Sequence, residues 1–100
     1  MISDEFLIVR TDGDWFDFRP EEYESVLRPK SFSSSPTKPD FGHYAINTDG
    51  LRLSFTFEEP GIQVVVEDGN IEEDQIHRIM IEILENIEQT TGQKGKIFVL

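Results

Sequence analysis

Residues 51–58 alternate between apolar and polar side chains, and this alternation constrains the fold more than any other feature of the chain. A period of two places one set of side chains on a buried face and the other in solvent, as in an antiparallel sheet. Turn sequences stand before and after this run, at residues 47–50 and 59–61. Residues 43–67 are therefore predicted to form an antiparallel meander of three strands. The apolar set is Leu51, Leu53, Phe55 and Phe57.

A long amphipathic helix is predicted after the meander, over residues 71–91. Apolar residues recur there at spacings of three and four, which is the helical period. Asn70 is a suitable N-cap with Glu73 three residues later, and Gly92 suits the position just beyond the last turn. A helix with one apolar stripe needs a surface to cover, so it is expected to lie across the sheet. The stripe consists of Ile76, Ile79, Met80, Ile83, Leu84 and Ile87.

Strands are also predicted at the two ends of the chain. Residues 5–10 are apolar on both faces, which favours a central position in the sheet. The turn signal at residues 11–14 predicts that residues 15–18 form a second strand, paired with the first as a hairpin. Residues 96–100 are predicted to form a last short strand.

The segment between the first strands and the meander is predicted to contain a short helix and a loop. Pro20 followed by two glutamates is typical of a helix start, so a short helix is expected over residues 20–28. Residues 29–42 contain three prolines and four serines. No periodicity is left in that segment, and it is predicted to be a long loop whose ends are pinned to the core by Phe32 and Phe41.

These elements predict an α+β fold in one domain over residues 1–100. An antiparallel sheet of five or six strands carries one long C-terminal helix on one face, with the short helix near residues 20–28. Hydrophobic residues make up 37% of the chain and eight residues are Phe, which is enough for one thin core. The order of the strands is not readable from the pattern.

Charge and cysteine content exclude several classes of protein. With 20 acidic and 9 basic residues, the chain has a formal net charge of -11. Such a charge argues against binding to nucleic acid or to anionic lipid. The chain has no Cys, which excludes disulfides and thiolate chemistry. Neither a secretory signal nor an apolar run long enough to span a bilayer is recognisable, so a cytoplasmic location is expected.

The acidic residues are concentrated, and the long helix carries the first candidate binding surface. Residues 57–91 contain ten acids and one base. Ile81 lies opposite the apolar stripe among these acids, where it can serve as the apolar anchor of a binding patch. The simpler interpretation, and the more frequent one, is a solvated helix back with one exposed isoleucine. The candidate residues are Asp74, Ile81, Glu82, Glu85 and Glu88, with Arg78 on the same face.

A second candidate surface surrounds Trp15, where Asp12, Asp14 and Asp17 form an acidic rim suited to a basic partner. The favoured alternative places Trp15 in the core and the aspartates in a turn. The Asp12-Gly13-Asp14 stretch resembles part of a calcium loop. It lacks the glutamate at the twelfth loop position, so no metal site is predicted.

No catalytic arrangement is recognisable, and neither an enzyme nor a cofactor is predicted. The serines of residues 31–35 do not lie in a nucleophile elbow, and His43 and His77 are expected to be structural. Two histidines without helical pair spacing do not suggest zinc. Phosphate-binding loops are also missing from the sequence.

The chain resembles the small acidic immunity proteins of bacterial toxin–immunity systems. The likeness covers mainly residues 51–100 and consists of size, lack of Cys, the α+β pattern, the strand Ile62-Gln63-Val64-Val65-Val66-Glu67, the acidic helix, and Thr91-Gly92-Gln93-Lys94-Gly95. The resemblance implies a non-catalytic inhibitor that masks the active site of a basic toxin, often a nuclease. The helix patch is expected to make the contact, because a rigid element presents anchors better than a turn.

Two alternatives come from other classes of protein. A structural or regulatory subunit would form a homodimer, and the apolar segment 97–100 suits strand addition to a neighbour. The favoured interpretation of this segment is that it completes the chain's own sheet. A small hydrolase is the third alternative, and it would need residues 29–42 to fold over a pocket beside His43.

Overall fold

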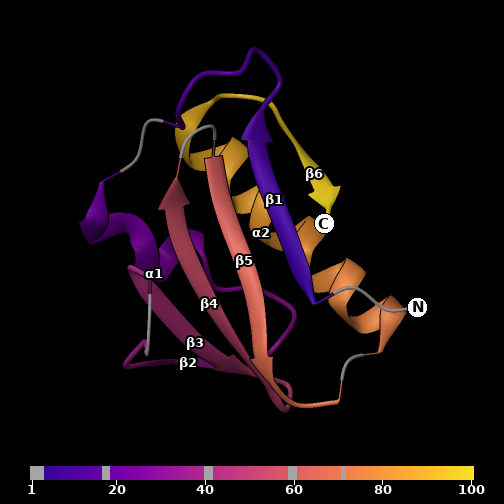
Figure 1. Ribbon diagram of the computed structural model, residues 1–100. Helices are drawn as coiled ribbons and strands as arrows, with labels where there is room; N and C mark the ends of the chain where they lie inside the picture. Colours follow the sequence, from indigo (N-terminus) through magenta and orange to yellow (C-terminus); the bar gives the residue numbers. More distant parts are fainter. Residues whose placement is uncertain (1–3, 17–18, 40–41, 59–60, 71) are drawn as a thin grey trace.

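The computed structural model describes residues 4–16, 19–39, 42–58, 61–70 and 72–100. It has the predicted α+β fold, a six-stranded antiparallel sheet with one long helix and one short helix (Figure 1). The strands are β1 (Glu5–Arg10), β2 (Ser34–Thr37), β3 (Tyr44–Thr48), β4 (Leu51–Glu58), β5 (Gly61–Asp68) and β6 (Gly95–Val99). The helices are a 3-10 turn (Pro20–Glu22), α1 (Tyr23–Val26) and α2 (Glu73–Thr91).

The strands follow the order β2-β3-β4-β5-β1-β6. The predicted meander is confirmed, since β3, β4 and β5 are consecutive neighbours paired antiparallel. β1 lies between β5 and β6 and is antiparallel to both, which agrees with its apolar residues on two faces. β5 and β6 are therefore parallel to each other, and α2 connects them by crossing the sheet over β1, as Figure 1 shows.

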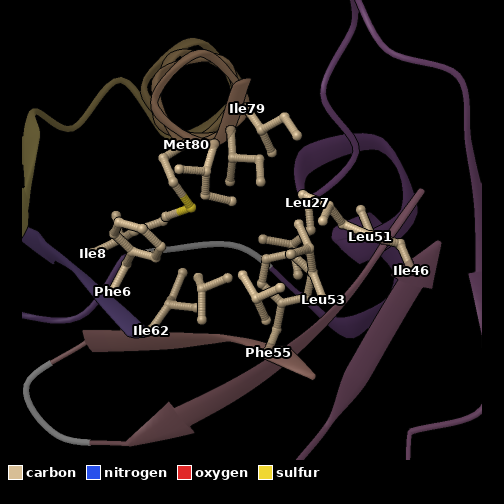
Figure 2. Packing of buried hydrophobic residues seen from close by; sticks show 14 of the residues in the cluster. Phe6, Ile8, Leu27, Ile46, Leu51, Leu53, Phe55, Ile62, Ile79 and Met80 are labelled. Carbon is tan, nitrogen blue, oxygen red and sulfur yellow. The ribbon is translucent and has the colours of Figure 1, made fainter. Parts of the chain in front are cut away.

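One core lies between α2 and a single face of the sheet. Figure 2 shows Met80 and Ile79 pointing from the helix toward Phe6, Ile8 and side chains of the meander strands. Five members of the predicted helix stripe are buried, and Leu84 packs against the core from its edge. Since successive strand residues point to opposite faces, the other face of the sheet carries the alternate residues, among them Leu7, Gln63 and Phe98.

The predicted hairpin of residues 5–10 and 15–18 is wrong in the part that the structure describes. Trp15 and Phe16 have irregular backbone, and residues 17 and 18 lie outside the described residues. The Arg10 guanidinium donates to the Trp15 carbonyl at 2.7 Å, and the Thr11 amide donates to the Lys94 carbonyl at 2.9 Å. These bonds turn the chain away from β1, whose pairing sites are occupied by β5 and β6.

The expectation of a loop over residues 29–42 is also wrong, because β2 forms within it and pairs with β3. β2 is an edge strand, where proline is tolerated since one row of backbone groups has no ladder partner. Arg28 stabilises this strand: its Nε donates to Ser34 Oγ at 2.9 Å and its Nη2 to the Ser34 carbonyl at 2.6 Å. Phe32 packs against the core as predicted, while Phe41 lies outside the described residues.

The helix boundaries differ from the predicted ones in detail. α1 ends at Val26 with Leu27 as its C-cap, so the short helix is shorter than residues 20–28. Glu72, not Asn70, occupies the N-cap of α2, and its side chain makes no capping hydrogen bond. Gly92 follows α2 in the left-handed conformation as predicted, with φ 72°. No helix in the described ranges is both long enough and apolar enough to cross a membrane.

Candidate functional site

The outer face of α2 presents Asp74, Ile81 and Glu85 to solvent. Glu85 follows Ile81 by four residues and Asp74 precedes it by seven, so the three lie on one side of the helix. Ile81 is 51% exposed, whereas the apolar residues on the opposite side of the helix are buried. Within the described part of the chain, neither carboxylate has an ion-pair partner. The arrangement is an apolar side chain between two uncompensated negative charges.

The other two helix candidates, Glu82 and Glu88, bond to backbone on opposite flanks of α2. The Ser31 amide donates to Glu82 Oε1 at 2.7 Å, and the Gly95 amide donates to Glu88 Oε2 at 3.0 Å. Both side chains are partly buried. The structure therefore divides the predicted patch into two parts. One is an exposed central part, and the other is a pair of carboxylates that hold α2 to the segment before β2 and to β6.

In the described part of the chain, Arg78 forms no ion pair with the carboxylates of this face. Its guanidinium lies over the ring of Phe32, 5.3 Å from the centroid, in a cation–π contact. The single base of the helix therefore lies against an aromatic ring on the β2 side of the outer face.

Two hollows lie beside the helix and extend the acidic surface. One of about 550 Å³ is lined by three carboxylates, Asp49, Glu72 and Asp74, together with Phe32 and Arg78. The other, of about 280 Å³, is lined by Glu82 and Glu85 together with Lys30, Ser31, Asn86 and Gln89. We name the outer face of α2 with these two hollows the α2 surface. Each hollow has room for a basic side chain of a partner.

Sequence reasoning missed the contribution of Asp49 and Glu72 to the α2 surface. Asp49 lies in the β3–β4 turn, with φ 47°. The side-chain Nε2 of Gln75 donates to the Asp49 carbonyl at 2.9 Å and to the Asp49 carboxylate at 2.6 Å. This pair fixes the turn against the first turn of α2. No pattern in the sequence links residues 26 positions apart, so only the fold reveals this contact.

Asn86 holds the α2 surface to the segment after α1. It is 4% exposed, and its Nδ2 donates to the Arg28 carbonyl at 2.8 Å. We expect Asn86→Ala to lower the free energy of unfolding by about 1–2 kcal/mol, because the partly buried Arg28 carbonyl loses its partner. Urea unfolding measures this, with Thr90→Ala on the exposed helix face as the control. Equal stability of the two variants would show that this bond does not fasten the helix.

The loop of the second candidate surface is internally bonded. Asp12 accepts the Asp14 amide at 3.1 Å and pairs with Arg10, and Asp14 accepts the Trp15 amide at 2.8 Å. The backbone hydrogen bond from Asp14, with Arg10 beside it, lowers the pKa of the Asp12 carboxyl. The Asp12 carboxylate is thus held in its ionised form, and both aspartates are exposed. Asp17 lies outside the described residues.

Trp15 is 42% exposed, which corrects the expectation that it belongs to the core. Its neighbour Phe16 takes the packing position instead: a Cβ added to Gly95 would lie 2.6 Å from Phe16 Cζ and 2.9 Å from Leu84 Cδ1. Trp15 lines a small pocket of about 170 Å³ with Phe16, Tyr23, Phe57, Gly61 and Ile62. Burial, and next the charge of Glu21, raises the pKa of the Tyr23 hydroxyl.

The histidines are placed as structural or solvent-exposed groups. His43 Nδ1 accepts the Phe57 amide at 3.1 Å, and its ring lies 5.4 Å from that of Phe57. His77 is exposed on α2. In the described ranges, no cluster of three or more His, Asp or Glu side chains is placed to hold a metal ion.

Comparisons with protein-family models, with curated proteins and with solved structures find no match to this chain.

Proposed function

We propose that this protein is a non-catalytic binding domain that masks a basic surface of a partner protein. The observation that carries the proposal is the α2 surface, where exposed Ile81 lies beside two hollows lined in part by carboxylates. Ile81 stands between Asp74 and Glu85, which have no ion-pair partner among the described residues. A net charge of -11 steers a cationic partner toward the chain and raises the rate of association.

On such a surface, the apolar centre contributes affinity and the surrounding charges contribute selectivity. Interfaces obtain most of their affinity from a few central residues that lose water on binding, with polar residues around them. Ile81 has this position on α2, and the surrounding carboxylates select lysine and arginine side chains. α2 is rigid over 19 residues because its opposite face is buried in the core, so it presents these groups in a fixed arrangement.

The more specific form of the proposal is an immunity protein of a toxin–immunity system, acting in the cytoplasm. Its partner would be a basic toxin, such as a nuclease, whose phosphate-binding groups require positive charge. An acidic domain that covers those groups inhibits the toxin by charge and shape without chemistry of its own. The likeness in size, composition and α+β pattern supports this form.

The test is a pair of double charge reversals with the same change in net charge. The partner is first captured from the native lysate and identified, and its affinity is then measured by calorimetry. We expect Asp74→Lys with Glu85→Lys to weaken binding by at least about 100-fold, because charges at the centre of the interface become repulsive. We expect Ile81→Ala to weaken binding by about tenfold.

The matched control is Asp4→Lys with Glu21→Lys, two exposed acids that belong to neither candidate surface. It changes the net charge equally, so it reduces long-range steering to the same degree, and salt screens both effects. Equal weakening by the two double variants would show that only the overall charge matters and would overturn the α2 surface as the interface. Circular dichroism of each variant verifies that the fold persists.

A further inference from the structure

The outer edge of β6 is the most apolar exposed part of the described structure. Phe98 is 45% exposed, and Val99 and Leu100 are each 57% exposed. β6 completes the chain's own sheet by pairing with β1, as predicted. No strand in the described ranges pairs with its other side, since β6 ends the strand order (Figure 1). An edge of this composition is a template for a further strand.

Two hydrogen bonds show which backbone groups of β6 point outward. The Thr11 amide donates to the Lys94 carbonyl, and the Leu100 amide donates to the Glu5 carbonyl at 3.0 Å. In an antiparallel pair such bonded positions alternate, so Lys96 and Phe98 also direct their backbone groups at β1. Gly95, Ile97 and Val99 direct theirs outward. The Gly95 amide is already bonded to Glu88. Among the described residues, the Gly95 carbonyl and the N–H and C=O groups of Ile97 and Val99 are left for a further strand.

We propose that β6 pairs antiparallel with β6 of a second copy of this chain, with Phe98 opposite the partner's Phe98. In this register Ile97 and the partner's Val99 exchange two hydrogen bonds, and the symmetry of the pair repeats them, which gives four. The register uses the outward N–H and C=O groups of Ile97 and Val99 and does not need the Gly95 amide. The two sheets continue into one sheet of twelve strands, with both α2 helices on the same side.

The side chains at this junction are self-complementary. Phe98 is paired with Leu7 on the open face of the sheet, so the junction forms one apolar row from Leu7 through Phe98 to the same residues of the second copy. Lys96 lies opposite the partner's Leu100, and the partner's Glu5 is the next residue in that row. Lys96 Nζ already lies 5.1 Å from the centre of the Phe98 ring, so it covers the aromatic pair and faces a carboxylate.

Two alternative registers are unfavourable for identifiable reasons. A register centred on Ile97 needs the Gly95 amide, which Glu88 occupies. A register centred on Lys96 needs the same amide and places two lysines opposite each other, which is destabilising. The hydrogen bond from the Gly95 amide to Glu88 and the charge of Lys96 thus disfavour these two registers relative to the one centred on Phe98. The edge is short, so we expect the pairing to bury less than the area of about 800 Å² per partner that stable interfaces bury. The dimer is therefore expected to be weak.

The first test compares two variants at position 99 by sedimentation over about 1 µM to about 1 mM chain, the range of a weak dimer. Val99→Pro removes one outward amide from each copy and keeps every bond to β1. We expect it to raise the dissociation constant of the dimer about 100-fold, since two hydrogen bonds are lost. Val99→Thr keeps the amide and serves as the control. A wild-type chain that stays monomeric over this range would overturn the proposal, as would equal dissociation constants for the two variants.

The second test reads the register and exploits the lack of Cys in the chain. With Phe98→Cys the two sulfurs lie at directly opposite positions, close enough for a disulfide on mild oxidation. Lys96→Cys lies on the same strand and the same face, but its partner cysteine is four residues away along the opposing strand. We expect the first variant to cross-link readily and the second hardly at all. Cross-linking of Lys96→Cys alone would contradict the proposed register.

Salt separates this dimer from the proposed function. Each copy has a net charge of -11, so the copies repel and the dimer should tighten as salt rises. Binding of a basic partner to the α2 surface should weaken over the same range. Failure of one proposal does not affect the other, because β6 and the outer face of α2 are different surfaces.

Discussion

Phe55→Ala is expected to lower the free energy of unfolding by about 4 kcal/mol, because it empties the centre of the core. Phe55 is 0% exposed and stands on β4 between the meander strands and the helices, as Figure 2 shows. Its removal deletes a whole aromatic ring from a small, closely packed interior. A domain of this size has only about 5–15 kcal/mol of total stability, so the melting temperature should fall by about 15–30 °C.

Thermal and urea unfolding measure this change, with Phe98→Ala as the matched control. Phe98 is the same residue type on a strand but is 45% exposed, so its replacement should cost less than about 1 kcal/mol at concentrations where the chain is monomeric. If both variants lost the same stability, the assignment of the core to the helix side of the sheet would be incorrect.

The second large effect is expected from Gly61→Ala at the start of β5. A Cβ at this position would overlap the Ile8 carbonyl oxygen and lie 2.8 Å from Val9 Cγ1. The first of these is backbone of the adjacent strand and cannot rotate away, so β1 and β5 would have to separate. We expect a loss of about 3 kcal/mol or more, at the upper end of overpacking effects.

Gly92→Ala is the control, because a Cβ there meets no neighbouring atom and only the strain of the left-handed backbone destabilises the fold. Gly92 has φ 72° and open space around its Cα, so alanine there should cost about 1–2 kcal/mol from the left-handed backbone alone. Unfolding in urea ranks the two variants. A Gly61→Ala chain as stable as Gly92→Ala would mean that β1 and β5 yield easily at this point.

The candidate site was predictable from the sequence only where helix periodicity decides exposure. Asp74, Ile81 and Glu85 lie opposite the apolar stripe, and the structure exposes all three. Glu82 and Glu88 lie on the flanks, where the outcome depends on which backbone amides come near. The lining of the hollows by Asp49 and Glu72 was not predictable, because it depends on a turn meeting the helix start.

Trp15 illustrates the same difference at the other end of the sheet. Its size favours burial, and by sequence alone the core is its expected place. In the fold, Arg10 binds the Trp15 carbonyl and Phe16 packs beside Gly95, so Phe16 is partly buried and its neighbour Trp15 is exposed. The choice between two adjacent aromatic residues depends on the space left by β6, which is distant in sequence.

The sequence by itself determined the α+β class, the meander, the buried stripe of α2 and the excess of negative charge. These features follow from period two, period 3.6 and composition, which are local properties of the chain. Only the tertiary structure decided that β1 lies between β5 and β6, that residues 34–37 form an edge strand, and which groups of β6 point outward. Strand order and hydrogen-bond phase are set by contacts between distant segments, and no local pattern encodes them.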